Sequence, residues 1–117
     1  MESMMAPSVA LDDDGFALAI GAAGGTRLRT ALVTAAAGIL DERLEPQDAV
    51  DRPCFHLAAG IVNAEPGVDE AALAALESRS LAVRRWSEFH HYFGGVSSVG
   101  RTGAAADVRR SGAVAAM

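Results

Sequence analysis

A short glycine-rich segment near the start of the chain lies between two apolar stretches and limits the possible folds more than any other feature. Residues 16–20 are continuously apolar, which is typical of a strand covered on both faces. After the loop at 21–25, apolar residues recur with helical spacing from Leu28 onward and predict a helix over 27–41. Thr26 is the expected N-cap of this helix. The sequence therefore predicts a strand, a tight loop and a helix in direct succession.

Glycines at positions 21, 24 and 25 allow backbone N–H groups to approach a ligand closely, and the helix start adds partial positive charge. Such a loop suits an anion or a developing oxyanion, although a purely structural turn explains it equally well. A dinucleotide-binding fingerprint would need glycine in place of Ala23 and Thr26, and no Gly-Lys-Ser/Thr run follows for a P-loop. An anion or nucleotide binder is therefore the weakest hypothesis for this loop.

The rest of the chain alternates strands and helices as a layered α/β fold does. The run at 12–15, Asp-Asp-Asp-Gly, predicts a hairpin turn rather than a metal site. Residues 55–65 are expected to be one extended stretch. No repeat or linker is visible, so residues 1–117 are expected to form one domain with a mixed, mainly antiparallel sheet. The other expected elements are strands at 7–11, 61–64, 81–83, 95–100 and 104–106, helices at 46–51 and 69–78, an aromatic loop at 86–93 and a surface turn at 109–112.

Composition limits the core and the possible partners. Half of the residues are hydrophobic but only 5% are aromatic, so the core must be built from small aliphatic side chains and is expected to lean on a partner or on self-association. The net charge of -5 argues against nucleic-acid binding. Most of the arginines in the pairs at 27/29, 84/85 and 109/110 are interpreted as solvated surface residues. No apolar run reaches the ~18 residues of a membrane span, and the N-terminus does not resemble a signal peptide, so the compartment is not indicated.

Few side chains in the sequence invite chemistry of their own. Cys54 is the only cysteine, which excludes an intramolecular disulfide and favours a small, half-buried apolar role. His56 is interpreted as a packing and hydrogen-bonding residue. His90 and His91 are adjacent and lack further ligands at metal-binding spacing, so no metal site is expected.

Four motifs occur in one order along nearly the whole chain. Residues 21–28, Gly-Ala-Ala-Gly-Gly-Thr-Arg-Leu, resemble the Gly-Ser-x-Gly-Gly-Ser-Arg-Ile motif in the small subunit of γ-glutamyltransferases. Residues 3–9 resemble the Ser-Ser-Met-Ser-Pro-Thr-Ile motif of that family. Residues 48–56 and 103–112 resemble its Glu-Ala-Val-x-x-Pro-Arg-Phe-His and Gly-Ala-Ala-Asp-Pro-Arg-Arg-x-Gly motifs. The chain is thus similar to the C-terminal part of that small subunit.

The resemblance implies a fold, a reaction and site residues. The family belongs to the N-terminal nucleophile hydrolases, so the chain is expected to form part of an αββα sandwich. In the family, an N-terminal Thr attacks the γ-glutamyl amide of a glutathione-type donor, and the acyl group passes to water or to an acceptor amine. The resemblance assigns the oxyanion-hole amides to Gly24 and Gly25 and the donor's α-carboxylate to Ser3, with Met4 in place of a second serine. It implies no metal and no cofactor.

The same resemblance identifies what this sequence lacks. Cys54, Leu57 and Val108 stand where the family has Arg, a second His and Pro. The nucleophilic Thr, the N-terminal part of the small subunit and the large subunit are expected upstream of Met1, so the chain alone is expected to be inactive and to need these partners. The alternative is a stand-alone, non-catalytic interaction module that pairs with itself or with another protein through an exposed sheet edge.

Overall fold

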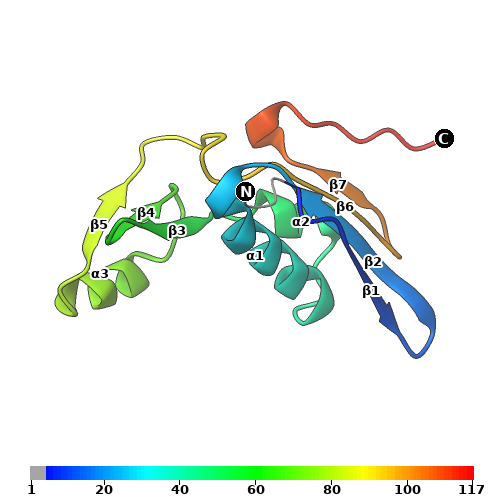
Figure 1. The fold of residues 1–117 in the computed structure, drawn as a ribbon, viewed down its shortest axis with the longest axis horizontal. Coiled ribbons are helices and arrows are strands. Elements are labelled where there is room, and N and C mark those ends of the chain that lie inside the picture. Colours follow the sequence, from blue (N-terminus) through cyan, green and yellow to red (C-terminus); the bar gives the residue numbers. More distant parts are fainter. Residues whose placement is uncertain (1–4) are drawn as a thin grey trace.

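The computed structural model describes residues 5–117. Its larger sheet is built from two antiparallel pairs of strands, one near the start of the chain and one near its end. The order of strands is β1-β2-β6-β7, and every neighbouring pair is antiparallel. The central pairing of β2 with β6 joins the first quarter of the chain to its last quarter (Figure 1). The strands are β1 (Ser8–Asp12), β2 (Gly15–Ala22), β6 (Val96–Gly100) and β7 (Ala104–Ala106).

The turn between β1 and β2 follows the expected chemistry. Asp12 Oδ1 accepts a hydrogen bond from the Asp14 N–H at 2.9 Å. Gly15 has φ 97°, a conformation that glycine adopts without steric cost. The acidic run is therefore a turn, and its first carboxylate also pairs with Arg101.

Helices cover one face of the larger sheet and build the main core. The short 3₁₀ helix η1 (Gly25–Arg27) leads directly into α1 (Leu28–Leu40), and α2 (Pro46–Asp51) follows. The Thr26 N-cap prediction was wrong, because this residue lies inside η1, and no side-chain hydrogen bond caps either helix. The buried core consists of Leu18, Ile20, Ala22, Leu28, Ala31, Ala35, Val50, Val96 and Ala105, which are the small aliphatic side chains that the composition predicts.

The smaller sheet has order β3-β4-β5 and a helix of its own. The strands β3 (Phe55–Ala58) and β4 (Ile61–Ala64) are antiparallel, and β4 and β5 (Ala82–Arg85) are parallel, with α3 (Glu70–Ser78) between them in the chain. The prediction of one extended stretch at 55–65 was wrong. Ala59 and Gly60 have φ values of 49° and 78° and reverse the chain into a hairpin. Asp69 caps α3 by accepting a hydrogen bond from the Ala71 N–H at 3.1 Å.

The face of the larger sheet opposite α1 is only partly covered. Figure 1 shows the C-terminal segment running along that side. A hollow of about 640 Å³ lies between the strands and residues 113–115. Val9 and Val99 on this face are 66% and 53% exposed. We call this surface the open sheet face. The structure is thus a mixed α/β fold with mainly antiparallel sheets, as the sequence predicts, and no helix of residues 5–117 is long and apolar enough to cross a membrane.

Candidate functional site

The glycine loop joins β2 to η1 in a backbone conformation that favours glycine. Gly24 has φ 138° and ψ 22°, and Gly25 has φ 62°. Residues with a Cβ rarely adopt these angles because the Cβ crowds their own backbone. A methyl group at Gly25 would meet no heavy atom of residues 5–117 within 4 Å, so backbone conformation rather than crowding by the described residues explains this glycine. At Gly24 the nearest atom would be Arg110 Nη2, at 3.5 Å.

The N–H groups of the loop differ from the one that precedes them. Ala23 N donates a hydrogen bond to Gly95 O at 3.1 Å. Within residues 5–117, the N–H groups of Gly24 and Gly25 donate none. The first N–H groups of a helix have no intrahelical acceptor and carry partial positive charge. The loop therefore presents two successive donors of the kind that stabilise an anionic oxygen.

A hollow of about 400 Å³ lies beside the loop. The segment before β1 reaches it, because Ala22 N donates a hydrogen bond to Met5 O at 3.0 Å. Ser3, to which the resemblance assigns the donor's carboxylate, lies outside the described residues. The lining is largely backbone and small apolar groups and includes Met5, Pro7, Gly21, Gly95 and Ser97.

A stack of cations and aromatic rings supports the loop from its helical side. Arg27 Cζ lies 4.6 Å from the centroid of the Tyr92 ring. Tyr92 stacks on Trp86 with centroids 5.0 Å apart, and Arg84 Cζ lies 4.9 Å from the Trp86 centroid. Each of the two arginine–ring contacts contributes roughly 0.5–1 kcal/mol to stability, as cation–π contacts do at exposed sites. The loop at 86–93 therefore connects η1 to β5, and its Phe93 is only 2% exposed.

His56 lies on β3 beside this stack. Its Nδ1 is 2.8 Å from Thr30 Oγ1 on α1, and its ring meets Tyr92 edge to face with centroids 6.4 Å apart. Burial and the charges of Arg27 and Arg29 lower the pKa of His56 from its ordinary value of 6.5. These contacts match the packing and hydrogen-bonding role that the sequence predicts.

Arg109 forms a buried ion-pair network that the sequence analysis missed. Its side chain is 1% exposed, and those of Glu65 and Asp107 are 0% and 3% exposed. Arg109 Nε and Nη2 donate to the two carboxylate oxygens of Glu65, each at 2.7 Å. Nη1 donates to Asp107 Oδ1 at 3.2 Å and to Val50 O at 2.9 Å, and Nη2 donates to Arg52 O at 2.8 Å. All the N–H groups of this guanidinium therefore have acceptors.

The interpretation of Arg109 as a solvated surface residue was wrong, because both of its carboxylate partners are buried beside it. Glu65 directly follows β4, 44 positions earlier in the chain. Burial alone would lower the pKa of the guanidinium, but the Glu65 hydrogen bonds and the Asp107 charge raise it above its ordinary value. An acid immediately after a buried strand and the Asp-x-Arg spacing at 107–109 were the available sequence signals.

Cys54 lies in the same buried region. The residue is 8% exposed, and its N–H donates to Glu65 Oε2 at 2.8 Å. Burial raises the pKa of the thiol to about 11. Because the thiolate is the reactive form, this thiol is inert near neutral pH. The apolar role predicted for Cys54 agrees with this environment, although the residue is buried rather than half-buried.

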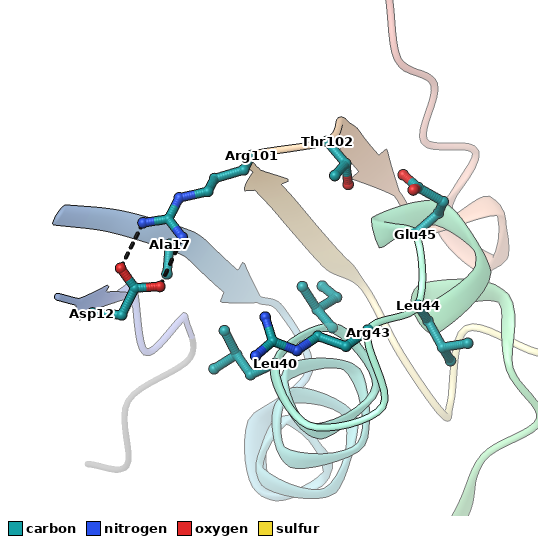
Figure 2. Close-up of a pocket in the computed structure, with 9 residues that line it drawn as sticks. Asp12, Ala17, Leu40, Arg43, Leu44, Glu45, Arg101 and Thr102 are labelled. Carbon is teal, nitrogen blue, oxygen red and sulfur yellow. Dashed lines mark hydrogen bonds and ion pairs between the residues drawn. The ribbon is translucent and has the colours of Figure 1, made fainter. Parts of the chain in front are cut away.

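A third hollow lies at the opposite end of α1 (Figure 2). Its volume is about 150 Å³, and Leu40 and Leu44 contribute apolar walls. Asp12 Oδ1 and Oδ2 accept hydrogen bonds from the Arg101 guanidinium at 2.6 and 2.7 Å. Both oxygens of this carboxylate are therefore already paired with an arginine of the same hollow. A 13-residue helix is roughly 20 Å long. This hollow is therefore separate from the glycine loop.

Metal ligands do not gather anywhere in the described part of the chain. No group of three His, Cys, Asp or Glu residues within 5–117 could hold a metal ion. His90 and His91 face each other with ring centroids 4.0 Å apart, and His90 Nδ1 accepts a hydrogen bond from the Tyr92 N–H at 3.1 Å. The two histidines thus have structural contacts within their own loop.

Comparison with known sequences identifies related proteins. A family model for gamma-glutamyltranspeptidase matches residues 1–117. The Acylase ACY 1 proenzyme of Pseudomonas sp. strain SE83 is 32% identical over 81 residues, which make up 69% of this chain. A second Acylase ACY 1 proenzyme, from strain V22, is 30% identical over 81 residues. The matched regions make up 14% of each acylase, so the chain spans only a small part of these relatives.

Solved structures share the fold. The transpeptidase CapD of Bacillus anthracis matches with a TM-score of 0.80 and 22% identity, over 99% of this chain and 72% of that one. The gamma-glutamyltranspeptidase of Pseudomonas nitroreducens matches with a TM-score of 0.78 and 19% identity, over 100% and 64% of the two chains. A cephalosporin acylase from Bacillus halodurans has a TM-score of 0.78 and 24% identity, over 91% and 21%.

The expected membership and fold are both confirmed by these matches. The family model covers the whole chain, and the structural neighbours share its arrangement of sheets and helices. The glycine loop, the antiparallel sheet and the helix that follows therefore belong to one known architecture. The chain is a member of the gamma-glutamyltranspeptidase family.

Proposed function

We propose that this chain is the C-terminal part of a γ-glutamyltransferase-like enzyme and that Gly24 and Gly25 supply its oxyanion-hole amides. The observation that carries the proposal is a pair of consecutive N–H groups at a helix start, with no acceptor among residues 5–117. Preorganised donors of this kind stabilise the charge that develops on a carbonyl oxygen during acyl transfer. Loss of one such donor typically lowers the rate by ~10²–10³.

The proposed reaction passes through two tetrahedral intermediates. A threonine hydroxyl, provided by the missing segment, adds to the γ-glutamyl carbonyl carbon, and its proton goes to the leaving amine as the C–N bond breaks. Water or an acceptor amine then attacks the resulting ester and releases the threonine. In both steps the carbonyl oxygen becomes anionic, and the amides of Gly24 and Gly25 donate hydrogen bonds to it. Ser3 is proposed to bind the donor's α-carboxylate.

The chain alone is proposed to be inactive because it has no competent nucleophile. Its threonines at 26, 30, 34 and 102 are internal, so none offers the free α-amino group that an N-terminal nucleophile uses as its base. The missing partners are the large subunit and the N-terminal part of the small subunit. The open sheet face, with its exposed Val9 and Val99, is the proposed contact for the second sheet of the sandwich.

Recombination with the missing segments tests this proposal. The chain is mixed with the Thr-bearing segment and large subunit of a family member, and hydrolysis of γ-glutamyl p-nitroanilide is followed. We expect turnover from the mixture only. Gly24→Ala should lower kcat by about 10²-fold or more, whereas Gly60→Ala, which also alters a positive-φ glycine but lies in the β3–β4 turn, should leave kcat unchanged in folded protein. Turnover by the chain alone, or equal kcat for both variants, would refute the assignment.

The open sheet face supports one alternative function, that of a non-catalytic interaction module. The hollow of about 640 Å³ on that face is lined mainly by small residues, which suits close approach of another sheet. A stand-alone module should form a stable homo-oligomer at micromolar concentration in sedimentation experiments, without any enzyme segment. A well-folded monomer that remains monomeric at that concentration would exclude self-association.

A further inference from the structure

Arg110 lies against the glycine loop although 85 or more positions separate the two in the sequence. The residue ends the 3₁₀ helix η2 (Val108–Arg110). Its Nε donates a hydrogen bond to Gly94 O at 2.6 Å, and its Nη2 donates to His91 O at 3.4 Å. The same Nη2 atom would be 3.5 Å from a methyl group placed on Gly24. The guanidinium is thus hydrogen-bonded to the segment before β6 and lies beside Gly24 of the loop after β2.

A second pair of glycines makes this arrangement possible. A methyl group on Gly95 would come within 2.5 Å of Arg110 Cδ and Nε and 3.0 Å of Ala23 O, so a side chain here would displace the guanidinium. The Gly95 carbonyl also accepts the hydrogen bond from the Ala23 N–H at 3.1 Å. Arg110 therefore packs on the short backbone contact that aligns the residue immediately before Gly24.

The buried network of Arg109 fixes the base of this arm. Arg109 is held by Glu65, Asp107 and two backbone carbonyls, so η2 cannot shift without breaking buried ion pairs. Asp107 Oδ1 also accepts the Arg109 N–H at 2.9 Å, and the Arg110 N–H donates to Asp107 O at 3.1 Å. The two adjacent arginines therefore differ in their surroundings. Arg109 is anchored in the interior, and Arg110 extends toward the glycine loop.

We propose that Arg110 is a positioning residue for the candidate oxyanion hole. Its guanidinium holds Gly94 and Gly95 against Ala23, which keeps the amides of Gly24 and Gly25 in one orientation, and its charge adds to the positive potential at the loop. The inference rests on the proposed function for its catalytic consequence, but the structural linkage is independent of any activity. Lysine can reach one carbonyl but cannot bridge two with a planar fork, so Arg110→Lys should restore only part of the effect.

Amide hydrogen exchange in the chain alone tests the linkage. In ¹⁵N-labelled protein, Arg110→Ala should accelerate exchange at the Ala23 amide by about tenfold or more, as expected when a local contact opens. It should also shift the Gly24 and Gly25 amide resonances, while the urea midpoint stays near that of the parent. Arg110→Lys should give intermediate values. Arg79→Ala is the matched control, because Arg79 is exposed and its side chain has no ion pair or hydrogen bond within residues 5–117. Unchanged Ala23 exchange and unchanged glycine resonances in Arg110→Ala would overturn the proposal.

The recombined enzyme provides the second measurement. Arg110→Ala should lower kcat for γ-glutamyl p-nitroanilide by about tenfold or more with little change in KM, since a misaligned oxyanion hole affects the transition state more than substrate binding. Partial recovery in Arg110→Lys and parental kinetics in Arg79→Ala would support positioning. A parental kcat in Arg110→Ala would contradict it. If the recombined parent itself shows no turnover, the proposed function fails, and the exchange experiment still decides whether Arg110 holds the loop.

Discussion

The junction between the two sheets depends on one residue, Arg109, whose guanidinium is buried. A buried charge is tolerated only when it is paired and hydrogen-bonded, and here two carboxylates and two carbonyls meet that requirement. Glu65 in turn accepts the Cys54 N–H, and the Glu65 N–H donates to Cys54 O at 3.0 Å. The network thus links α2, β4 and η2 through side chains that water does not reach.

Arg109→Ala should be strongly destabilising because it leaves the carboxylates of Glu65 and Asp107 buried without a counter-charge. Breaking a buried ion pair in this way typically costs about 3–5 kcal/mol. Urea denaturation followed by far-UV circular dichroism measures the free energy of unfolding. Arg79→Ala, an exposed arginine, should change it by no more than about 0.5 kcal/mol. A loss for Arg109→Ala as small as that of the control would show that the network contributes little.

His56 should make folding stability depend on pH near neutrality. Its pKa is lowered in the folded protein by burial and by Arg27 and Arg29, so the unfolded chain takes up the proton first as pH falls. The stability that neutral His56 contributes is fully present above pH 6.5, the ordinary pKa of histidine. It is lost as the pH drops through the lower pKa that His56 has in the folded protein. His56→Gln should flatten this part of the pH profile of unfolding free energy. A profile identical to that of the parent between pH 7 and 5 would contradict the assignment.

At the scale of elements, the contact between α1 and α2 depends on a missing side chain. A methyl group on Gly38 would lie 3.0 Å from Ala49 Cβ and 3.3 Å from Arg52 Nη1. The two helices approach each other at this position. Pro46, which is nearly fully buried, can begin α2 because the N–H group that proline lacks would have no intrahelical acceptor at the first helical position.

Gly38→Ala should not give the gain of about 1 kcal/mol that helix propensity alone would provide. Because the new methyl group would press on Ala49 Cβ, the two helices would have to separate, and overpacking of this kind typically costs about 1–3 kcal/mol. We expect a net loss in thermal denaturation. Val33→Ala on the exposed face of α1 is the control and should be neutral or slightly stabilising. A rise in Tm for Gly38→Ala would show that the helices adjust freely.

At the scale of the whole molecule, local patterns predicted the elements better than their contacts. Helical spacing and Pro46 placed α1 and α2 almost at their observed ends, and Gly24 and Gly25 of the loop have the positive φ angles that favour glycine. The hairpin at Ala59 was missed because Ala-Gly is not a usual turn pair, so 55–65 resembled one extended segment. The burial of Arg109 was missed because its partner Glu65 is 44 positions away, and the local signals at 65 and 107–109 do not show that the two residues pair.

The open sheet face is also a feature of the whole molecule. A sheet with helices on one face and only a C-terminal segment on the other is half of an αββα sandwich, which is what the family resemblance predicts. We propose that a second layer completes this scaffold and that the glycine loop supplies the oxyanion site of the completed enzyme. Activity is expected to belong to the assembled enzyme, and the two glycine amides are this chain's proposed share of it.

A crystal structure of the recombined enzyme with a γ-glutamyl boronate bound to the catalytic threonine tests the central claim most directly. The boronate oxygen stands in for the oxyanion of the tetrahedral intermediate. The account predicts this oxygen within about 2.7–3.1 Å of both Gly24 N and Gly25 N, with hydrogen-bonding geometry. An oxygen that contacts other donors, or glycine N–H groups that instead donate to protein acceptors, would contradict the claim.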